Sequence, residues 1–226
     1  MSALTEEIRQ KYNQVRTQID QAAWSVSRQP EEVHLVVVTK AQPVAVVAAA
    51  VEAGAKILGE NYPEETLPKI QSLPEGSEVE WHMIGHLQSR KARIIVENFN
   101  LLESLDNLHL ASKLEQLLIE KDRRLPIFLE INVSGEESKN GFVGWNEVKW
   151  DNLLPEIDKL FAFPHLSIQG LMTMPPLFDD PAKARPFFAR LHRLADFLSN
   201  RYGEEHFQDL SMGTSVDFPV AVQEGA

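Results

Sequence analysis

The sequence of 226 residues contains no cysteine. This absence excludes disulfide bonds, thiolate nucleophiles and thiolate metal ligands, so any chemistry must use other side chains. A chain without cysteine fits a reducing compartment, and its N-terminal stretch MSALTEEIRQKYNQ is polar and acidic, unlike a basic and then apolar targeting segment. No run approaches the roughly 18 consecutive apolar residues that span a membrane. We therefore expect a cytoplasmic protein that does not enter a membrane.

Positive charge is also scarce. Lys and Arg number 22 against 33 Asp and Glu, which gives a formal net charge of −11. Such a surface repels the phosphodiester backbone of nucleic acids and anionic lipid, although a local pocket for a small phosphate is compatible with it. We expect no nucleic-acid partner. The hydrophobic content of 43% suffices for one large core, so we expect a single domain over residues 1–226. We also expect a monomer, although the net charge favours solubility and does not itself set the oligomeric state.

Apolar stretches rich in β-branched residues alternate with longer stretches of helical spacing, and no Gly/Ser linker separates them. The predicted strands are residues 34–39, 56–59, 81–84, 100–104, 126–132, 167–172 and 208–212. The predicted helices are residues 3–26, 43–54, 63–71, 87–97, 106–122, 146–160 and 181–202. In the helix at 106–122, Asp106 is the candidate N-cap. Four leucines of that helix share one face, which predicts burial against the core: Leu110, Leu114, Leu117 and Leu118.

Strands buried on both faces in βα order predict a parallel sheet, which is either a closed (β/α)8 barrel or an open doubly wound sheet. Polar residues follow nearly every strand: Lys40, Glu60, Asn61, His86, Glu103, Ser104, Asn132, Ser134, Thr173, Ser211 and Ser215. In a barrel all these strand ends converge on one face, whereas an open sheet binds ligands near one switch point. No GxGxxG follows the first strand. We therefore predict an α/β fold of the TIM-type (β/α)8 barrel class.

The stretch VHLVVVTKAQP places Lys40 after an apolar run that we expect to be buried. A lysine amine is nucleophilic only when neutral, and desolvation at the mouth of a packed barrel lowers its pKa toward the range in which it forms a Schiff base with an aldehyde. The alternative is a strand-end lysine whose stem covers apolar surface while its ammonium reaches water. Position alone favours this second interpretation.

Two motifs follow the second and third predicted strands. In GENYPEE, Pro63 is expected at the first helical position with acidic residues in the first turn, but a helix start requires neither Asn61 nor Tyr62. In WHMIGHLQSRKAR, His82 lies within a strand and His86 after it, so the two do not share a helical face and a metal pair is not expected. We expect His82 to form hydrogen bonds inside the barrel.

The stretch LSMGTSVDF places Ser211, Gly213, Thr214 and Ser215 where the last predicted strand passes into a helix. Small hydroxyl groups and free backbone N–H groups at such a junction can hold a phosphate. The alternative is an ordinary helix cap by Ser215. The motif by itself does not choose between the two.

Taken together, VVVTK, GENYPEE, WHMIGHLQSRK, EINVSGEESKNGF, IQGLMTM and LSMGTSVDF resemble the YggS/PROSC family, the pyridoxal 5′-phosphate homeostasis proteins. The resemblance implies a fold similar to the N-terminal barrel of alanine racemase, with pyridoxal phosphate held at the C-terminal strand ends. Lys40 then occupies the position of the Schiff-base lysine, with Asn61 near the cofactor ring and His86 near the site. The residues implied in the phosphate loop are Ser211, Gly213 and Ser215.

The resemblance also implies that the protein binds, buffers and delivers the cofactor, with pyridoxal-phosphate-dependent apo-enzymes as recipients, and does not turn over a substrate. Racemases of this fold carry a second, all-β domain that supplies a catalytic tyrosine, and this chain has no room for one. Without a positioned base, a Schiff base on Lys40 is a store. The alternatives are a racemase-like enzyme and an interaction scaffold whose site is empty.

Three departures from the family pattern stand out. Thr214 occupies a position that is usually methionine, and Pro63 one that is usually valine. The family continues past EGA with a segment resembling VRIGxxIFG, which forms the eighth strand and half of the phosphate site, whereas this sequence stops at Ala226. The resemblance therefore implies a C-terminally truncated barrel that lacks its last strand and has two unpaired edges.

Overall fold

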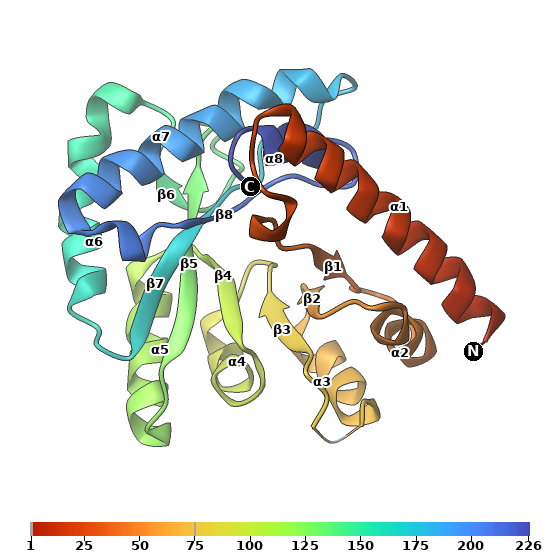
Figure 1. The fold of residues 1–226 in the computed structure, drawn as a ribbon. Coiled ribbons are helices and arrows are strands. Elements are labelled where there is room, and N and C mark those ends of the chain that lie inside the picture. The colour runs from red at the N-terminus through yellow and green to blue at the C-terminus, as the bar shows by residue number, and fades with distance from the viewer. Residues whose placement is uncertain (1, 75) are drawn as a thin grey trace.

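The computed structural model describes residues 2–74 and 76–226, whose strands form one curved parallel sheet (Figure 1). The strands are β1 (Val36–Val38), β2 (Ile57–Glu60), β3 (Glu80–Met83), β4 (Leu101–Leu105), β5 (Leu125–Asn132), β6 (Phe142–Val143), β7 (Leu166–Met172) and β8 (Asp209–Ser211). They pair in the order β1-β2-β3-β4-β5-β7-β8, and β6 pairs with β5 outside this path. All seven predicted strands are confirmed within two residues of their predicted ends, and β6 was not predicted.

Helices cover the outer side of the sheet (Figure 1). The α-helices are α1 (Ala3–Ser25), α2 (Val44–Ala53), α3 (Pro63–Ser72), α4 (Ala92–Asn98), α5 (Leu108–Lys121), α6 (Leu154–Phe161), α7 (Arg185–Tyr202) and α8 (Phe218–Gln223). Short 3₁₀ turns are η1 (Pro30–Glu32), η2 (Ser89–Lys91), η3 (Glu147–Leu153), η4 (Pro181–Ala184) and η5 (Glu204–His206). Three of these turns form the first part of predicted helices. None of the helices built from the described residues combines the length and hydropathy needed to cross a membrane.

The start of α5 corrects one prediction. Asn107, not Asp106, is the N-cap, and its side chain accepts a hydrogen bond from the Leu110 N–H at 2.8 Å. Asp106 instead lies 2.9 Å from the ring of His86, because β4 runs on to Leu105 and carries Asp106 to the strand end. The predicted apolar face is confirmed, since all four leucines are buried.

The two faces of the sheet differ in chemistry because successive side chains point to opposite faces. The face that packs on the helices is apolar except at Glu60, which pairs with Lys69 of α3, and its fully buried residues include Leu58, Met83 and Ile127. The opposite, concave face carries a small apolar cluster of Leu101, Phe128 and Met172. Polar side chains join this cluster on the concave face and belong to the candidate site.

The sheet is a TIM-type barrel that lacks one strand. Strands β1 and β8 end the pairing order, and no ladder joins them among the residues that the structure describes. The expectation of a buried run before Lys40 is therefore wrong in part, since Val36 and Val37 are half-buried and Val38 is 47% exposed. A strand with one neighbour leaves part of its surface to solvent.

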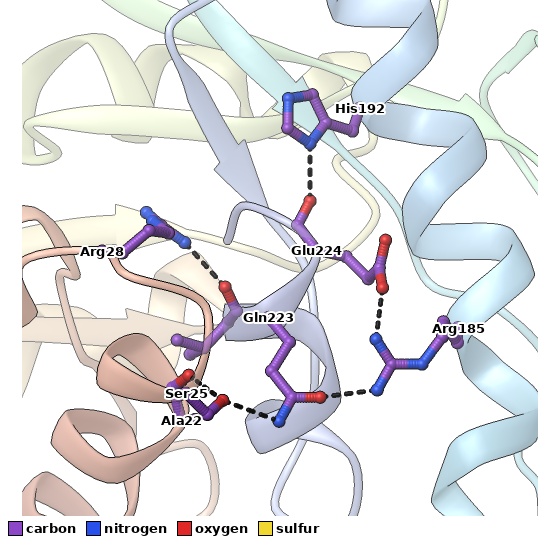
Figure 2. Close-up of polar contacts among 8 residues, drawn as sticks. Ala22, Ser25, Arg28, Arg185, His192, Gln223 and Glu224 are labelled. Carbon is purple, nitrogen blue, oxygen red and sulfur yellow. Dashed lines mark hydrogen bonds and ion pairs between the residues drawn. The ribbon is translucent and has the colours of Figure 1, made fainter.

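Helix α8 lies beside α1 and is held between α1 and α7 by polar contacts (Figure 2). The Arg28 guanidinium donates to the Val222 and Ala226 carbonyls, both at 2.8 Å, which satisfies groups left free at the end of the helix. From the other side, Arg185 pairs with Glu224, whose carbonyl also lies 2.8 Å from His192 Nδ1. The first and last segments of the described chain therefore stabilise each other.

Candidate functional site

Lys40 lies in a tight turn directly after β1. The Gln42 N–H donates to the Thr39 carbonyl at 3.1 Å, and Ala41 has a left-handed φ of +58°. Thr39 is buried, whereas Lys40 is exposed and its ammonium makes no hydrogen bond or ion pair with residues 2–74 or 76–226. Of the two interpretations of this position, the structure fits the strand-end lysine that reaches water and not the desolvated one, because β1 lies at an open edge of the sheet. The amine is free and faces water.

The residue before Lys40 belongs to a buried polar network that sequence reasoning missed. The Thr39 hydroxyl donates to Glu60 Oε1 at 2.7 Å, and Lys69 Nζ donates to the same oxygen at 2.6 Å. Lys69 Nζ also donates to the Thr39 carbonyl at 2.8 Å. The available signal was the spacing of Pro63, Thr66 and Lys69, which share the buried face of α3 at every third residue.

Asn61 lies against the loop that follows β3. A Cβ on Gly85 would come within 2.9 Å of the Asn61 side chain, so only glycine permits this close approach. Asn61 Oδ1 is buried and has no hydrogen-bond partner among the described residues. Two predicted site residues, Asn61 and His86, are therefore adjacent through Gly85, and an acceptor beside them is left unsatisfied.

His86 forms an exposed cluster with charged and polar neighbours. Its Nδ1 lies 2.9 Å from Asp106 Oδ2 and 3.4 Å from Asn140 Nδ2. At the end of β5, burial and the negative charge of Asp106 raise the pKa of Glu130 to about 7, while His86 and Lys139 oppose this shift. Glu130 was not singled out from the sequence, where it is one acidic residue in an apolar strand.

A second polar chain crosses the concave face from β3 to β8. His82 Nδ1 lies 2.7 Å from Glu103 Oε1, and the Ser211 hydroxyl donates to Glu103 Oε2 at 2.5 Å. The predicted hydrogen bonding of His82 inside the barrel is confirmed. Glu103 is fully buried, so both contacts are strong, and the Ser211 hydrogen is committed to a carboxylate. The Ser211 hydroxyl is therefore not free to donate to an anion while this bond persists.

The loop after β8 depends on a glycine and on α8. Gly213 has a φ of +90°, and a Cβ there would lie 2.7 Å from the Ala221 Cβ. The Thr214 N–H and hydroxyl donate to Asp217 Oδ1 at 2.6 and 2.9 Å. The interpretation of Ser215 as a helix cap is wrong, because Asp217 holds the cap position and Ser215 is exposed.

The predicted residues fall into two groups at the C-terminal strand ends. Lys40, Asn61 and His86 follow β1, β2 and β3, which are neighbours in the sheet. The second group follows or ends β8, at the other limit of the pairing order: Ser211, Gly213 and Ser215. The hydrogen bonds of the described residues join the two sides through the chain from Ser211 to His82 on the concave face.

Comparison with known proteins adds a family and a fold. The family profile described as "Alanine racemase, N-terminal domain" matches residues 11–219. A pyridoxal phosphate homeostasis protein of Synechocystis sp. is 39% identical over 197 residues, which is 87% of each chain. PipY of Synechococcus elongatus, solved with PLP bound, is 32% identical with a TM-score of 0.78 and covers 92% of this chain and 94% of PipY.

A more distant structure shares the fold alone. An alanine racemase of Clostridium difficile is 14% identical, with a TM-score of 0.66. The match covers 86% of this chain but 51% of the racemase. The predicted likeness to the N-terminal barrel of alanine racemase is thus confirmed.

Proposed function

Because this chain belongs to the pyridoxal phosphate homeostasis proteins, which are built on the alanine racemase N-terminal domain, we propose that it binds pyridoxal 5′-phosphate (PLP) and takes part in intracellular PLP homeostasis. In this role it buffers and delivers the cofactor in the cytoplasm, as a monomer, to apo-enzymes that require it. PLP supplies an aldehyde that condenses reversibly with an amine and releases water.

The free amine of Lys40 is the single observation that carries this proposal. It is an exposed lysine at a C-terminal strand end, where barrels of this type bind ligands, and it forms no ion pair with the residues that the structure describes. Lys40 is the proposed covalent attachment point. Asn61 supports it, because its buried and unpartnered Oδ1 fits a ligand that brings a hydrogen-bond donor beside the amine. His86 completes this side of the proposed site.

The loop after β8 is the proposed phosphate side. Gly213 holds the loop in a left-handed conformation. Ser215 is exposed and its hydroxyl has no hydrogen-bond partner among the described residues, so it can donate to an anion. Ser211 is proposed to position this loop and not to donate to the phosphate, because its hydroxyl hydrogen is donated to Glu103. These assignments give the cofactor two points of attachment, an amine on one side and a donor loop on the other.

A store differs from an enzyme in what faces the bound group. Proton transfer in a racemase needs an acid or base on the proper side of the cofactor. The curated relative that is 39% identical to this chain is named a pyridoxal phosphate homeostasis protein, a name that describes no proton transfer. The proposed role is therefore retention and release without robust turnover. Exchange of the α-proton of an amino acid in heavy water, measured by NMR with PLP present, would reveal the racemase-like alternative.

The attachment is tested by adding PLP to the purified protein, reducing with borohydride and mapping the modified peptide by mass spectrometry. We expect one main adduct on Lys40 and its loss in Lys40→Ala. Lys56→Ala is the matched control, because Lys56 is also exposed but precedes β2, at the N-terminal ends of the strands and away from the proposed site. An equally reducible adduct in Lys40→Ala would refute the assignment of Lys40.

A further inference from the structure

Lys69 is a buried lysine that the proposed function leaves unexplained. Its side chain is 5% exposed, and its Nζ contacts Glu60 Oε1 at 2.6 Å and the Thr39 carbonyl at 2.8 Å. Each contact residue directly precedes a proposed cofactor residue, since Thr39 precedes Lys40 and Glu60 precedes Asn61. One ammonium therefore connects two neighbouring strand ends that carry the proposed site.

Thr39 is fixed through each of its polar groups. Its N–H donates to the Gly59 carbonyl at 3.0 Å, and its hydroxyl donates to Glu60 at 2.7 Å. Its carbonyl accepts from Lys69 at 2.8 Å and from the Gln42 N–H at 3.1 Å. The backbone at the start of Lys40 therefore has a fixed direction, although the Lys40 side chain lies in solvent.

Stability does not account for this arrangement. Removing two charges from water offsets most of the attraction between them, and apolar replacements of a buried ion pair are often neutral or stabilising. Glu60 is fully buried, and its Oε2 has no hydrogen-bond partner among the described residues. Such an unsatisfied oxygen is costly. The chain keeps a costly contact at the point that orients the turn of Lys40.

We propose that Lys69 is a positioning residue, whose contacts with Thr39 and Glu60 set the placement of the Lys40 amine relative to Asn61 and to the rest of the cofactor site. The inference rests on the proposed function, because it concerns the same ligand. It adds a residue that does not touch that ligand and acts through the backbone of the turn.

Positioning affects only a ligand that is held at two points. PLP condenses with the amine while its phosphate and ring are bound elsewhere, so a displaced amine loses the advantage of correct placement. A small neutral aldehyde such as propanal has no second attachment point. It reports the chemistry of the exposed Lys40 amine alone, whatever the direction of the turn.

The experiment compares the two aldehydes in wild type and variants. Adducts are trapped with borohydride over a range of aldehyde concentrations, and occupancy of the Lys40 peptide is measured by mass spectrometry. We expect Lys69→Met to weaken PLP attachment at Lys40 about tenfold or more, while propanal occupancy changes less than about twofold. The induced circular dichroism of the bound cofactor should fall as well, because its orientation is no longer fixed.

Two further variants cover the case in which Lys69→Met does not fold. The double variant Glu60→Gln with Lys69→Met leaves no unpaired buried charge, and Thr39→Val removes only the hydroxyl contact. Both should weaken PLP attachment without a change for propanal, and Thr39→Ser should restore it. Lys91→Met is the matched control, because Lys91 pairs with Glu64 of α3 at 2.8 Å but does not contact Thr39.

The outcomes separate this inference from the proposed function. If wild type forms no PLP adduct at Lys40, the proposed function fails. If wild type forms it and the folded double variant keeps the wild-type ratio of PLP to propanal attachment, only the positioning role of Lys69 is overturned. An equal loss for both aldehydes also overturns it, because Lys69 would then act on the reactivity of the amine.

Discussion

The two ends of the open sheet hold their candidate residues in different ways. At the β1 end, the turn that carries Lys40 is held by Thr39, which hydrogen-bonds to both members of the buried ion pair between Lys69 and Glu60. At the β8 end, the loop from Gly213 to Ser215 is shaped by a glycine conformation and by packing on α8. The β1 end therefore depends on a buried ion pair, whereas the β8 end depends on backbone conformation and close packing.

This difference has a consequence for binding. The β1 end of the proposed site is held by contacts inside the sheet and with α3, so we expect its backbone geometry to be set before a ligand binds. The phosphate end relies on α8, which is held by Arg28 on one side and by Arg185 and His192 on the other (Figure 2). Changes at the two ends should therefore differ in kind as well as in size.

The largest effect on stability is expected from Lys69→Met at the β1 end. It leaves the Glu60 carboxylate buried without its cation, which costs about 3 to 5 kcal/mol of unfolding free energy. Urea denaturation followed by circular dichroism measures the change. The double variant Glu60→Gln with Lys69→Met removes both charges and should recover most of the loss. A single variant as stable as wild type would show that the contact between Lys69 and Glu60 does not stabilise the fold.

At the β8 end, Gly213→Ala should lower the free energy of unfolding by about 3 kcal/mol. Part of the cost is the left-handed φ of +90°, and part is the 2.7 Å approach of the new Cβ to Ala221. Hydrogen exchange should show that protection is lost first in α8. Gly76→Ala is the control, because Gly76 has a φ of +80° but no described atom within 4 Å of the added Cβ. Equal losses would mean that packing on α8 contributes nothing.

Much of this architecture could be predicted from local patterns. Runs of β-branched residues indicated the strands, because strands of a parallel sheet are buried on both faces, and the spacing of apolar residues indicated the helices, because a helix is buried on one. The convergence of Lys40, Asn61 and His86 on neighbouring strand ends follows from βα order alone. Motif likeness then supplied the family.

The remainder depends on contacts between distant segments. Lys69 meets Thr39 across 30 residues, and Ser211 meets Glu103 across 108, so no local pattern reveals either bond. The exposure of Lys40 follows from an unpaired edge of the whole sheet. The error at Asp106 arose because the next residue, Asn107, has the side chain that caps α5. The cap interpretation of Ser215 fails because the N-cap position of α8 lies two residues later, at Asp217.

Between the two ends of the sheet, the raised pKa of Glu130 on β5 predicts that the free energy of unfolding depends on pH. Burial keeps its carboxyl protonated in the folded chain up to a pKa of about 7, whereas in the unfolded chain it ionises near 4.5. The folded state therefore holds more protons between these values, so this group's contribution to stability falls as pH rises from about 4.5 to 7. Glu130→Gln should be more stable than wild type by about 2 kcal/mol at pH 8 and about equal to it at pH 4.

Urea denaturation of both proteins at several pH values measures this difference. His86→Ala is a useful companion, because the positive charge of His86 opposes the shift and its loss should extend the protonated range of Glu130. A difference between Glu130→Gln and wild type that does not vary with pH would contradict the raised pKa.

The smallest expected effect is a gain in stability from a substitution at Ala41, in the turn that carries Lys40. Its φ of +58° costs an L-residue about 1 to 2 kcal/mol, and glycine removes that cost while it adds about 0.5 to 1 kcal/mol of chain entropy to the unfolded state. Ala41→Gly should therefore stabilise the fold by about 0.5 kcal/mol. Ala45→Gly, in the first turn of α2, should instead destabilise it, because its conformation is helical.

The Ala41→Gly variant also tests how firmly the turn is held. If the contacts of Thr39 fix the turn, Ala41→Gly should leave PLP attachment at Lys40 unchanged, whereas in a flexible turn the added glycine would weaken that attachment.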